Sequence, residues 1–252
     1  MEIIDAHSHL YYPGEYFAHS LFPTFEDRVR TLREAGVSRA LASRNESVAD
    51  RSYEELWESN KRIAKACEAS EGLYFPSALI QPEDDRACEL LRRCREELGM
   101  RFMGEMFEDV LGHTWGTPRY YKLIECAIDL RVVPLIHCRD AVVVDIGTRY
   151  PEGRFIIAHL RIDGGSEGRL EALAPYPNLC MDISGSAVAS ASLIREAIQG
   201  LGVERVLFGS DMGAVDPVIA AMCVKRSGLS EEDQRKVFAE NFKSLWEWTG
   251  GA

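Results

Sequence analysis

The chain begins with two histidines whose spacing suits one metal ion. The segment DAHSH, residues 5–9, closes the first apolar run of the sequence. Side chains of a strand alternate between its faces, so His7 and His9 are expected on one face, together with Ile3 and Asp5. Two imidazoles at positions i and i+2, at the end of a strand, can bind one ion. Taken alone, the pair could equally be two surface or capping histidines.

Further side chains of metal-binding type end later apolar runs, and none of them is cysteine. Nitrogen and oxygen ligands are typical of a catalytic zinc, manganese or iron site with an open position. Burying so many polar groups without a cation would be costly. We therefore predict a divalent metal centre of one or two ions, with Zn²⁺ as the first expectation and Mn²⁺ or Fe²⁺ as alternatives. Its predicted ligands are His7, His9, Glu105, His137, His159 and Asp211.

The elements that must position these residues repeat along the chain. Short apolar runs alternate with longer amphipathic stretches, and the runs are nearly continuous, as in strands buried on both faces of a parallel sheet. Helices are expected between them, with a last helix over 230–248 that Ser230 can cap. The eight predicted strands are 2–6, 38–42, 73–80, 101–106, 132–137, 154–159, 178–183 and 205–209.

This alternation predicts an α/β fold, a (β/α)₈ TIM barrel, as one domain over residues 1–252. An open, doubly wound sheet is the alternative, but no G-x-G-x-x-G follows the first strand. In a TIM barrel the active site forms at the C-terminal ends of the strands. The predicted ligands fall at those ends, so they are expected to meet there.

The pattern of ligands along the strands resembles the amidohydrolase superfamily, which consists of metal-dependent TIM-barrel enzymes. The segments IIAHLRIDG (156–164), PNLCMDISG (177–185) and VLFGSDMGAVDP (206–217) resemble its amidohydrolase-2 branch, which includes hydrolases, lactonases and metal-dependent decarboxylases. The segment VPLIHCRDA (133–141) and the pair Gly104-Glu105 also resemble the TatD-like branch, whose bridging metal ligand is a glutamate.

The resemblance implies a first ion held by four residues: His7, His9, His137 and Asp211. In two-metal members Glu105 would bridge the ions, and His137 and His159 would hold the second. In one-metal decarboxylases His159 would act as a base instead. Many members carry a carbamylated lysine as the bridge, where this chain has Glu105.

Metal-dependent hydrolysis is the function we predict from these residues. A metal lowers the pKa of bound water and polarises the substrate oxygen. Asp211 would pass the water's proton to the leaving group, with His159 as acid–base if one ion binds. The substrate would be a small ester, lactone, amide or phosphoester. The alternative is a metal-dependent decarboxylase of an unsaturated or aromatic carboxylic acid; a TatD-like nuclease and a non-catalytic metal-binding relative are less favoured.

Three arginines follow strand ends and could bind an anionic substrate group. These are Arg44, Arg139 and Arg161, and arginine binds carboxylate or phosphate bidentately. Surface ion pairs are an equally good interpretation. Aromatic residues in the loop 10–23 could cap the pocket or form contacts in a homo-oligomer.

Composition narrows the class of partner. The net charge of −11 over 252 residues disfavours nucleic acid, and a small molecule is the expected partner. Seven cysteines without a CxxC pair indicate reduced thiols in a cytoplasmic protein. No apolar run is long enough to span a bilayer, so no membrane partner is expected.

Overall fold

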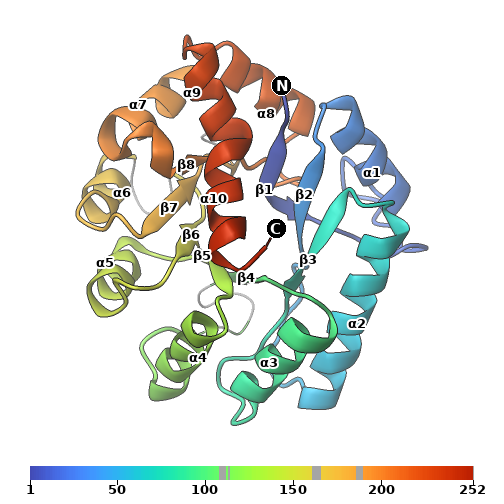
Figure 1. The fold of residues 1–252 in the computed structure, drawn as a ribbon. Coiled ribbons are helices and arrows are strands. Elements are labelled where there is room, and N and C mark those ends of the chain that lie inside the picture. The colour runs from blue at the N-terminus through green and yellow to red at the C-terminus, as the bar shows by residue number, and fades with distance from the viewer. Residues whose placement is uncertain (108–111, 113, 161–165, 186–189, 252) are drawn as a thin grey trace.

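Eight parallel strands form a nearly closed barrel that is surrounded by helices (Figure 1). The computed structural model describes residues 1–107, 112, 114–160, 166–185 and 190–251. Each strand pairs with the next along the chain, in the order β1-β2-β3-β4-β5-β6-β7-β8. The predicted (β/α)₈ TIM barrel is thus confirmed.

The strands coincide with the apolar runs of the sequence, although several are shorter. The predicted run 154–159 yields only a three-residue strand, so His159 lies two residues beyond it. The last run, 205–209, yields a strand of two residues. The strands are β1 (Ile4–His9), β2 (Arg39–Ser43), β3 (Tyr74–Ala78), β4 (Phe102–Phe107), β5 (Val133–His137), β6 (Phe155–Ile157), β7 (Leu179–Asp182) and β8 (Val206–Leu207).

Helices follow the strands and begin at recognisable caps. Thr24 Oγ1 accepts from Asp27 N at 3.0 Å, and Ser230 caps the last helical stretch as expected. The helices are α1 (Phe25–Glu34), α2 (Tyr53–Ala69), α3 (Ala87–Glu97), α4 (Pro118–Asp129), α5 (Asp140–Arg149), α6 (Ser166–Leu173), α7 (Ala191–Leu201), the 3₁₀ turn η2 (Val203–Arg205), α8 (Pro217–Lys225), α9 (Glu231–Arg235), the π-helical turn η3 (Lys236–Glu240) and α10 (Asn241–Trp248).

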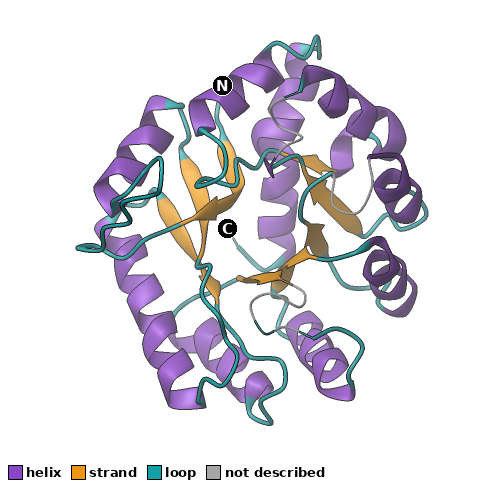
Figure 2. Cartoon of the chain, turned by 180° about the vertical axis from the view of Figure 1, so that it is seen from behind, coloured by secondary structure: helices purple, strands orange, loops and turns teal. Residues whose placement is uncertain are grey.

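The apolar core has two parts. One lies between the barrel and its helices. The other fills the barrel interior with side chains from all eight strands, and Phe242 and Leu245 of α10 close it at one end. Figure 2, which shows the molecule from behind, displays the loops that join strands to helices. No helix of the described chain is long and apolar enough to cross a membrane.

The common face expected for Ile3 and the two histidines of β1 is wrong. Ile4 and Ala6 pack inside the barrel, whereas Ile3 packs in the outer core. The pairing of β1 with β2 shifts register between Asp5 and Ser8. Such an irregularity changes the direction of the side chains that follow it. The two histidines therefore point to the barrel mouth because of this register shift, and simple alternation from Ile3 does not predict their direction.

The barrel closes between β8 and β1 without a continuous ladder among the described residues. Ala6 N donates to Phe208 O at 2.9 Å, and Asp211 N donates to His7 O at 2.8 Å. One isolated bridge joins Ser8 to Met212. We call this junction the closing seam.

Candidate metal centre

Glu105 lies between two pairs of imidazoles at the C-terminal end of the barrel. Its Oε2 is 3.4 Å from His7 Nε2 and 3.6 Å from His9 Nε2. Its Oε1 is 2.9 Å from His137 Nδ1 and 3.7 Å from His159 Nε2. All four predicted histidines therefore converge on one buried carboxylate.

Asp211 completes the cluster from the other side of the closing seam. Its Oδ1 lies 2.9 Å from His9 Nε2. The ligand atoms of His7, His9 and Asp211 lie within 4.8 Å of one another, and those of His7, Glu105 and His159 do so as well. Each set is close enough to hold a single ion.

His137 is joined to the cluster through Glu105. It belongs to neither three-residue set of the described chain. Its ring stacks on Phe107, with centroids 3.7 Å apart, and meets His159 edge-on at 4.6 Å. The expectation that His137 shares the ion of His7 and His9 stays a prediction.

Local backbone geometry turns Glu105 toward the histidines. Gly104 has φ +107°, and a Cβ there would lie 2.4 Å from Leu135 O, so only glycine fits. Ser43 Oγ, at the end of β2, accepts from Glu105 N at 2.7 Å. His159 and Asp211 also have positive φ, of 62° and 53°. These residues lie at strand ends, where the chain can leave regular geometry.

Residues behind the cluster fix which ring nitrogen faces its centre. Asp182 Oδ2 lies 2.9 Å from His7 Nδ1, and Ser184 Oγ lies 2.8 Å from His159 Nδ1. Ser184 also donates to Asp182 Oδ1. A carboxylate on one ring nitrogen sets the tautomer of a metal-ligating histidine. His7 Nε2 is buried without a hydrogen bond. A bound cation would satisfy this nitrogen, so the donor set fits a divalent ion.

Charge is concentrated in this centre. Burial alone raises the pKa of Glu105, but the charge of His7 and hydrogen bonds from His137 and His159 outweigh burial and hold its pKa well below the usual range. Burial likewise raises the pKa of Asp182, yet His7 brings it down to about 2. Both carboxylates are therefore anionic at neutral pH and favour a cation between the imidazoles.

The cluster forms the floor of a pocket of about 480 Å³. This size is typical of sites for small molecules. Aromatic side chains from the loop after β1 and from the end of β4 line it, and the rings of Tyr11 and Phe17 stack with centroids 4.1 Å apart. The lining residues outside the cluster are Tyr11, Phe17, Arg28, Arg44, Asn45, Phe107, Met212, Gly213 and Ala214.

The three predicted substrate arginines differ in their placement. Arg44 lines the pocket, but it pairs with Glu15 at 3.2 Å and donates to Leu10 O at 3.2 Å. Arg139 is exposed at the start of α5 and is absent from the described lining of the pocket. Arg161 lies outside the described residues. The substrate roles of all three stay predictions.

Sequence reasoning missed three residues at the site. Ser184 follows Asp182 by two positions, so strand alternation could have suggested it. Asn45, whose Nδ2 lies 3.2 Å from His9 Nε2, follows a strand end, where functional residues gather. Arg28 comes from the middle of α1, and no local pattern marks it.

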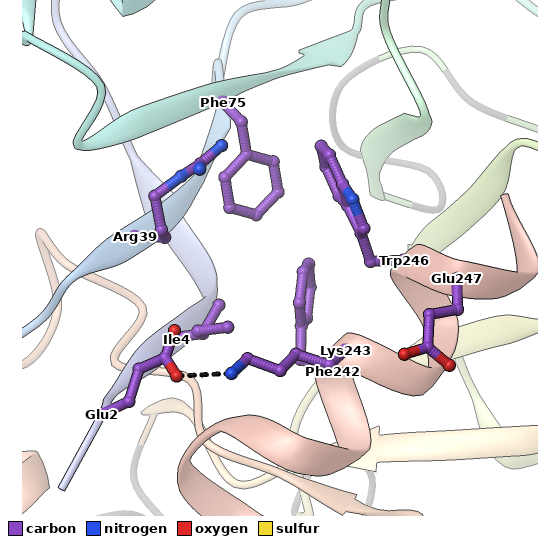
Figure 3. Close-up of a pocket in the computed structure, with 8 residues that line it drawn as sticks. All are labelled: Glu2, Ile4, Arg39, Phe75, Phe242, Lys243, Trp246 and Glu247. Carbon is purple, nitrogen blue, oxygen red and sulfur yellow. Dashed lines mark hydrogen bonds and ion pairs between the residues drawn. The ribbon is translucent and has the colours of Figure 1, made fainter. Parts of the chain in front are cut away.

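A second cavity, of about 290 Å³, lies where β1 and β2 begin and α10 packs (Figure 3). The Arg39 guanidinium lies 5.6 Å from the centre of the Phe75 ring and 5.9 Å from that of Trp246. The lining of this cavity includes no histidine or cysteine.

A (β/α)₈ barrel with histidines and carboxylates converging at its C-terminal mouth is the architecture of metal-dependent TIM-barrel enzymes. The family model described as Amidohydrolase matches residues 4–247. The chain therefore belongs to the amidohydrolase family. Membership of this family and the TIM-barrel fold support the interpretation that the protein is an enzyme. A search of curated proteins found no match.

Solved structures share this fold at low sequence identity. A dihydroxybenzoic acid decarboxylase from Polaromonas sp. JS666, with bound manganese and the inhibitor 2-nitroresorcinol, is 18% identical with a TM-score of 0.77, over 98% of this chain and 97% of that chain. A 5-carboxyvanillate decarboxylase from Sphingomonas paucimobilis is 13% identical with a TM-score of 0.73, over 98% and 99%. A "probable 2-pyrone-4,6-dicarboxylic acid hydrolase" from Acinetobacter baumannii, with bound citric acid, is 15% identical with a TM-score of 0.70, over 98% and 100%.

Proposed function

We propose that the protein is a metal-dependent decarboxylase of an aromatic or otherwise unsaturated carboxylic acid. The observation that carries the proposal is a cluster of metal-ligand type on the floor of an aromatic-walled pocket of about 480 Å³. Such a pocket suits one planar ring. The similar structures named for decarboxylation of aromatic acids favour this reaction over the hydrolysis expected first from the sequence.

A divalent ion in the centre would supply Lewis-acid polarisation of a substrate oxygen. For decarboxylation with one ion, the proposed ligands are His7, His9, Glu105, His137 and Asp211, and His159 would join them only if a second ion binds. The nitrogen and oxygen donors of this set suit zinc or manganese. The manganese in the Polaromonas enzyme makes Mn²⁺ the first ion to test. Zinc stays the expectation from the donor set.

Decarboxylation requires a proton on the ring carbon that carries the carboxylate. The bond to the carboxyl carbon then breaks, its electron pair restores the ring, and CO₂ leaves. His159 suits the delivery of this proton, because Ser184 occupies its Nδ1 while Nε2 faces the pocket floor. Asp211, which also lines the pocket, is the second proposed proton-transfer group.

Hydrolysis is the second candidate function, and the position of Glu105 favours it. Its two oxygens face different imidazole pairs, His7 with His9 and His137 with His159. A carboxylate shared in this way suits a bridge between two ions, and two-metal sites activate water for hydrolysis.

The deciding experiment incubates the Mn²⁺-loaded protein with 2,6-dihydroxybenzoate, 5-carboxyvanillate and 2-pyrone-4,6-dicarboxylate in D₂O and follows the products by mass spectrometry. Decarboxylation predicts loss of CO₂ and gain of one ring deuteron. Addition of water without loss of CO₂ would contradict it and support the hydrolase. The variant His159→Gln should lose turnover, while His19→Gln, an exposed histidine away from the cluster, should not.

We also infer a reducing compartment such as the cytoplasm, because all seven cysteines are free thiols. The proposed partner is a small-molecule acid. Residues 1–252 are proposed to act as one domain, as the sequence suggests.

A further inference from the structure

Arg28 is a buried arginine of α1 that reaches the rim of the metal centre. Only 1% of the residue is exposed. Its Nη1 donates to His9 O at 2.6 Å and to Met212 O at 2.8 Å, and its Nε donates to Phe22 O at 3.3 Å. One guanidinium thus bonds backbone oxygens from three separate segments.

No carboxylate of the described chain forms an ion pair with Arg28. The guanidinium instead lies 3.8 Å above the ring of Tyr11. A buried charge is costly unless it is well hydrogen-bonded. The carbonyl oxygens are therefore its main compensation, so its contribution lies in these bonds rather than in an ion pair.

The two carbonyls held by Nη1 lie on opposite sides of the closing seam. His9 ends β1, and Met212 follows Asp211 beyond β8. In place of a continuous ladder, the described chain joins β8 to β1 through the Ala6–Phe208 and Asp211–His7 backbone hydrogen bonds and the Ser8–Met212 bridge. The close contact of His9 Nε2 with Asp211 Oδ1 spans the same seam. Arg28 adds a side-chain cross-link to these backbone contacts, next to the two residues that the centre must hold at a fixed separation.

The absence of a side chain at Gly213 leaves space for the Arg28 guanidinium. A Cβ at this position would lie 3.3 Å from Arg28 Nη2, closer than most real Cβ contacts. The backbone after Asp211 thus runs directly against the guanidinium. Thr24, which caps α1, fixes the start of the helix that carries Arg28 one turn later.

We propose that Arg28 is a positioning residue that sets the separation of His9 and Asp211 across the closing seam and thereby the affinity of the centre for a divalent ion. The inference rests on the proposed metal-dependent function. Residues that orient metal ligands typically change metal affinity about 10- to 100-fold when they are replaced. Arg28 acts through the carbonyls of His9 and Met212, not by touching the ion.

The test measures the dissociation constant for Mn²⁺ by calorimetry in the metal-free wild type and in Arg28→Met and Arg28→Lys. Arg30→Met is the matched control, because Arg30 lies on the same helix but is exposed and pairs with Asp27. We expect about 10- to 100-fold weaker binding in Arg28→Met, a smaller loss in Arg28→Lys, and no change in Arg30→Met. The visible spectrum of bound Co²⁺ should change in both Arg28 variants, a readout that a loss of fold stability alone would not move.

The outcomes separate this inference from the function on which it rests. Mn²⁺ affinity and a Co²⁺ spectrum equal to the wild type in Arg28→Lys and Arg28→Met would overturn the positioning role and leave the proposed function intact. If Arg28→Met does not fold, Arg28→Lys decides alone by the same two readouts. A wild type that binds neither ion would overturn the proposed metal-dependent function, and the inference with it.

Discussion

At the scale of single residues, the centre depends on which nitrogen each histidine leaves free. Asp182 occupies Nδ1 of His7, and Ser184 occupies Nδ1 of His159. Both rings therefore present Nε2 to Glu105. The residues behind the cluster thus contribute as much to its chemistry as the candidate ligands do.

Replacement of Ser184 by alanine tests this arrangement. Without the hydroxyl, the His159 ring loses its Nδ1 partner, and we expect kcat to fall about 10- to 100-fold with little change in KM. Steady-state kinetics on an acid that the enzyme decarboxylates provide the measurement. Ser190→Ala, whose side chain bonds only Ser192 among the described residues, is the control. Unchanged kcat in Ser184→Ala would show that His159 needs no such partner.

Asp211→Asn tests the proton-transfer role. The amide keeps an oxygen near His9 but cannot exchange a proton, so we expect turnover to fall by about 10²-fold or more while much of the metal is retained. Turnover and metal content are measured on the same preparation. Near-normal turnover would assign proton transfer to another group.

At this scale the sequence predicts which residues are candidate metal ligands, but it does not predict the direction of their side chains. Six of them stand near strand ends, where a barrel gathers functional groups, and the structure brings those six together. In β1, alternation counted from Ile3 does not carry through to the histidines, because the register shift between Asp5 and Ser8 is a tertiary feature. Arg28 leaves no local signal, since its contacts form with residues up to 184 positions away.

At the scale of elements, strand ends position the site by departing from regular geometry. Gly104 in β4 is the clearest case, because it has φ +107° and a Cβ there would lie 2.4 Å from Leu135 O. The apolar runs predicted all eight strands because each is buried on both faces. Exact ends were less predictable, since β6 and β8 are shorter than the apolar runs that contain them, and strand pairing rather than local composition sets where a strand ends.

The variant Gly104→Ala should destabilise the fold. A methyl group would overlap Leu135 O at 2.4 Å in addition to the strain of positive φ, so we expect a cost above about 3 kcal/mol. Gly72→Ala is the matched control, because Gly72 has φ +82° but no atom within 4 Å of an added Cβ; it should cost about 1–2 kcal/mol. Urea titration measures both, and equal losses would mean that the strand relaxes around the methyl group.

At the scale of the whole molecule, an ion at the closing seam would join the two ends of the sheet. His9 lies at the end of β1 and Asp211 beyond β8, so a ligand set that includes both ties residues about two hundred positions apart. An ion that binds only the folded chain stabilises it by mass action. Metal and fold stability are therefore expected to be coupled.

Removal of metal should lower the melting temperature. With free Mn²⁺ at a thousand times its dissociation constant, the stabilisation is about 4 kcal/mol, which corresponds to about 10 °C for a chain of this size. Scanning calorimetry with Mn²⁺ and with EDTA checks this. The variant Glu105→Gln should show a smaller difference, and an identical Tm with and without metal would contradict the coupling.

Metal affinity should also rise with pH. Imidazoles bind a metal only in the neutral form. Burial lowers the pKa of His7, but the charges of Glu105 and Asp182 outweigh burial and raise it well above its ordinary value. Binding therefore releases protons and strengthens as pH increases from about 6 to 8. Calorimetry in two buffers of different ionisation enthalpy counts the released protons. Affinity that is constant over this range would argue against histidine ligands.

The central claim is that the residues at the mouth of the barrel hold a divalent ion. Elemental analysis after equilibration with Mn²⁺ and gel filtration tests it most directly, with the double variant His7→Ala/His9→Ala beside His19→Ala. We expect one or two ions per chain in the wild type and in His19→Ala, and almost none in the double variant. Equal metal content in all three proteins would contradict it.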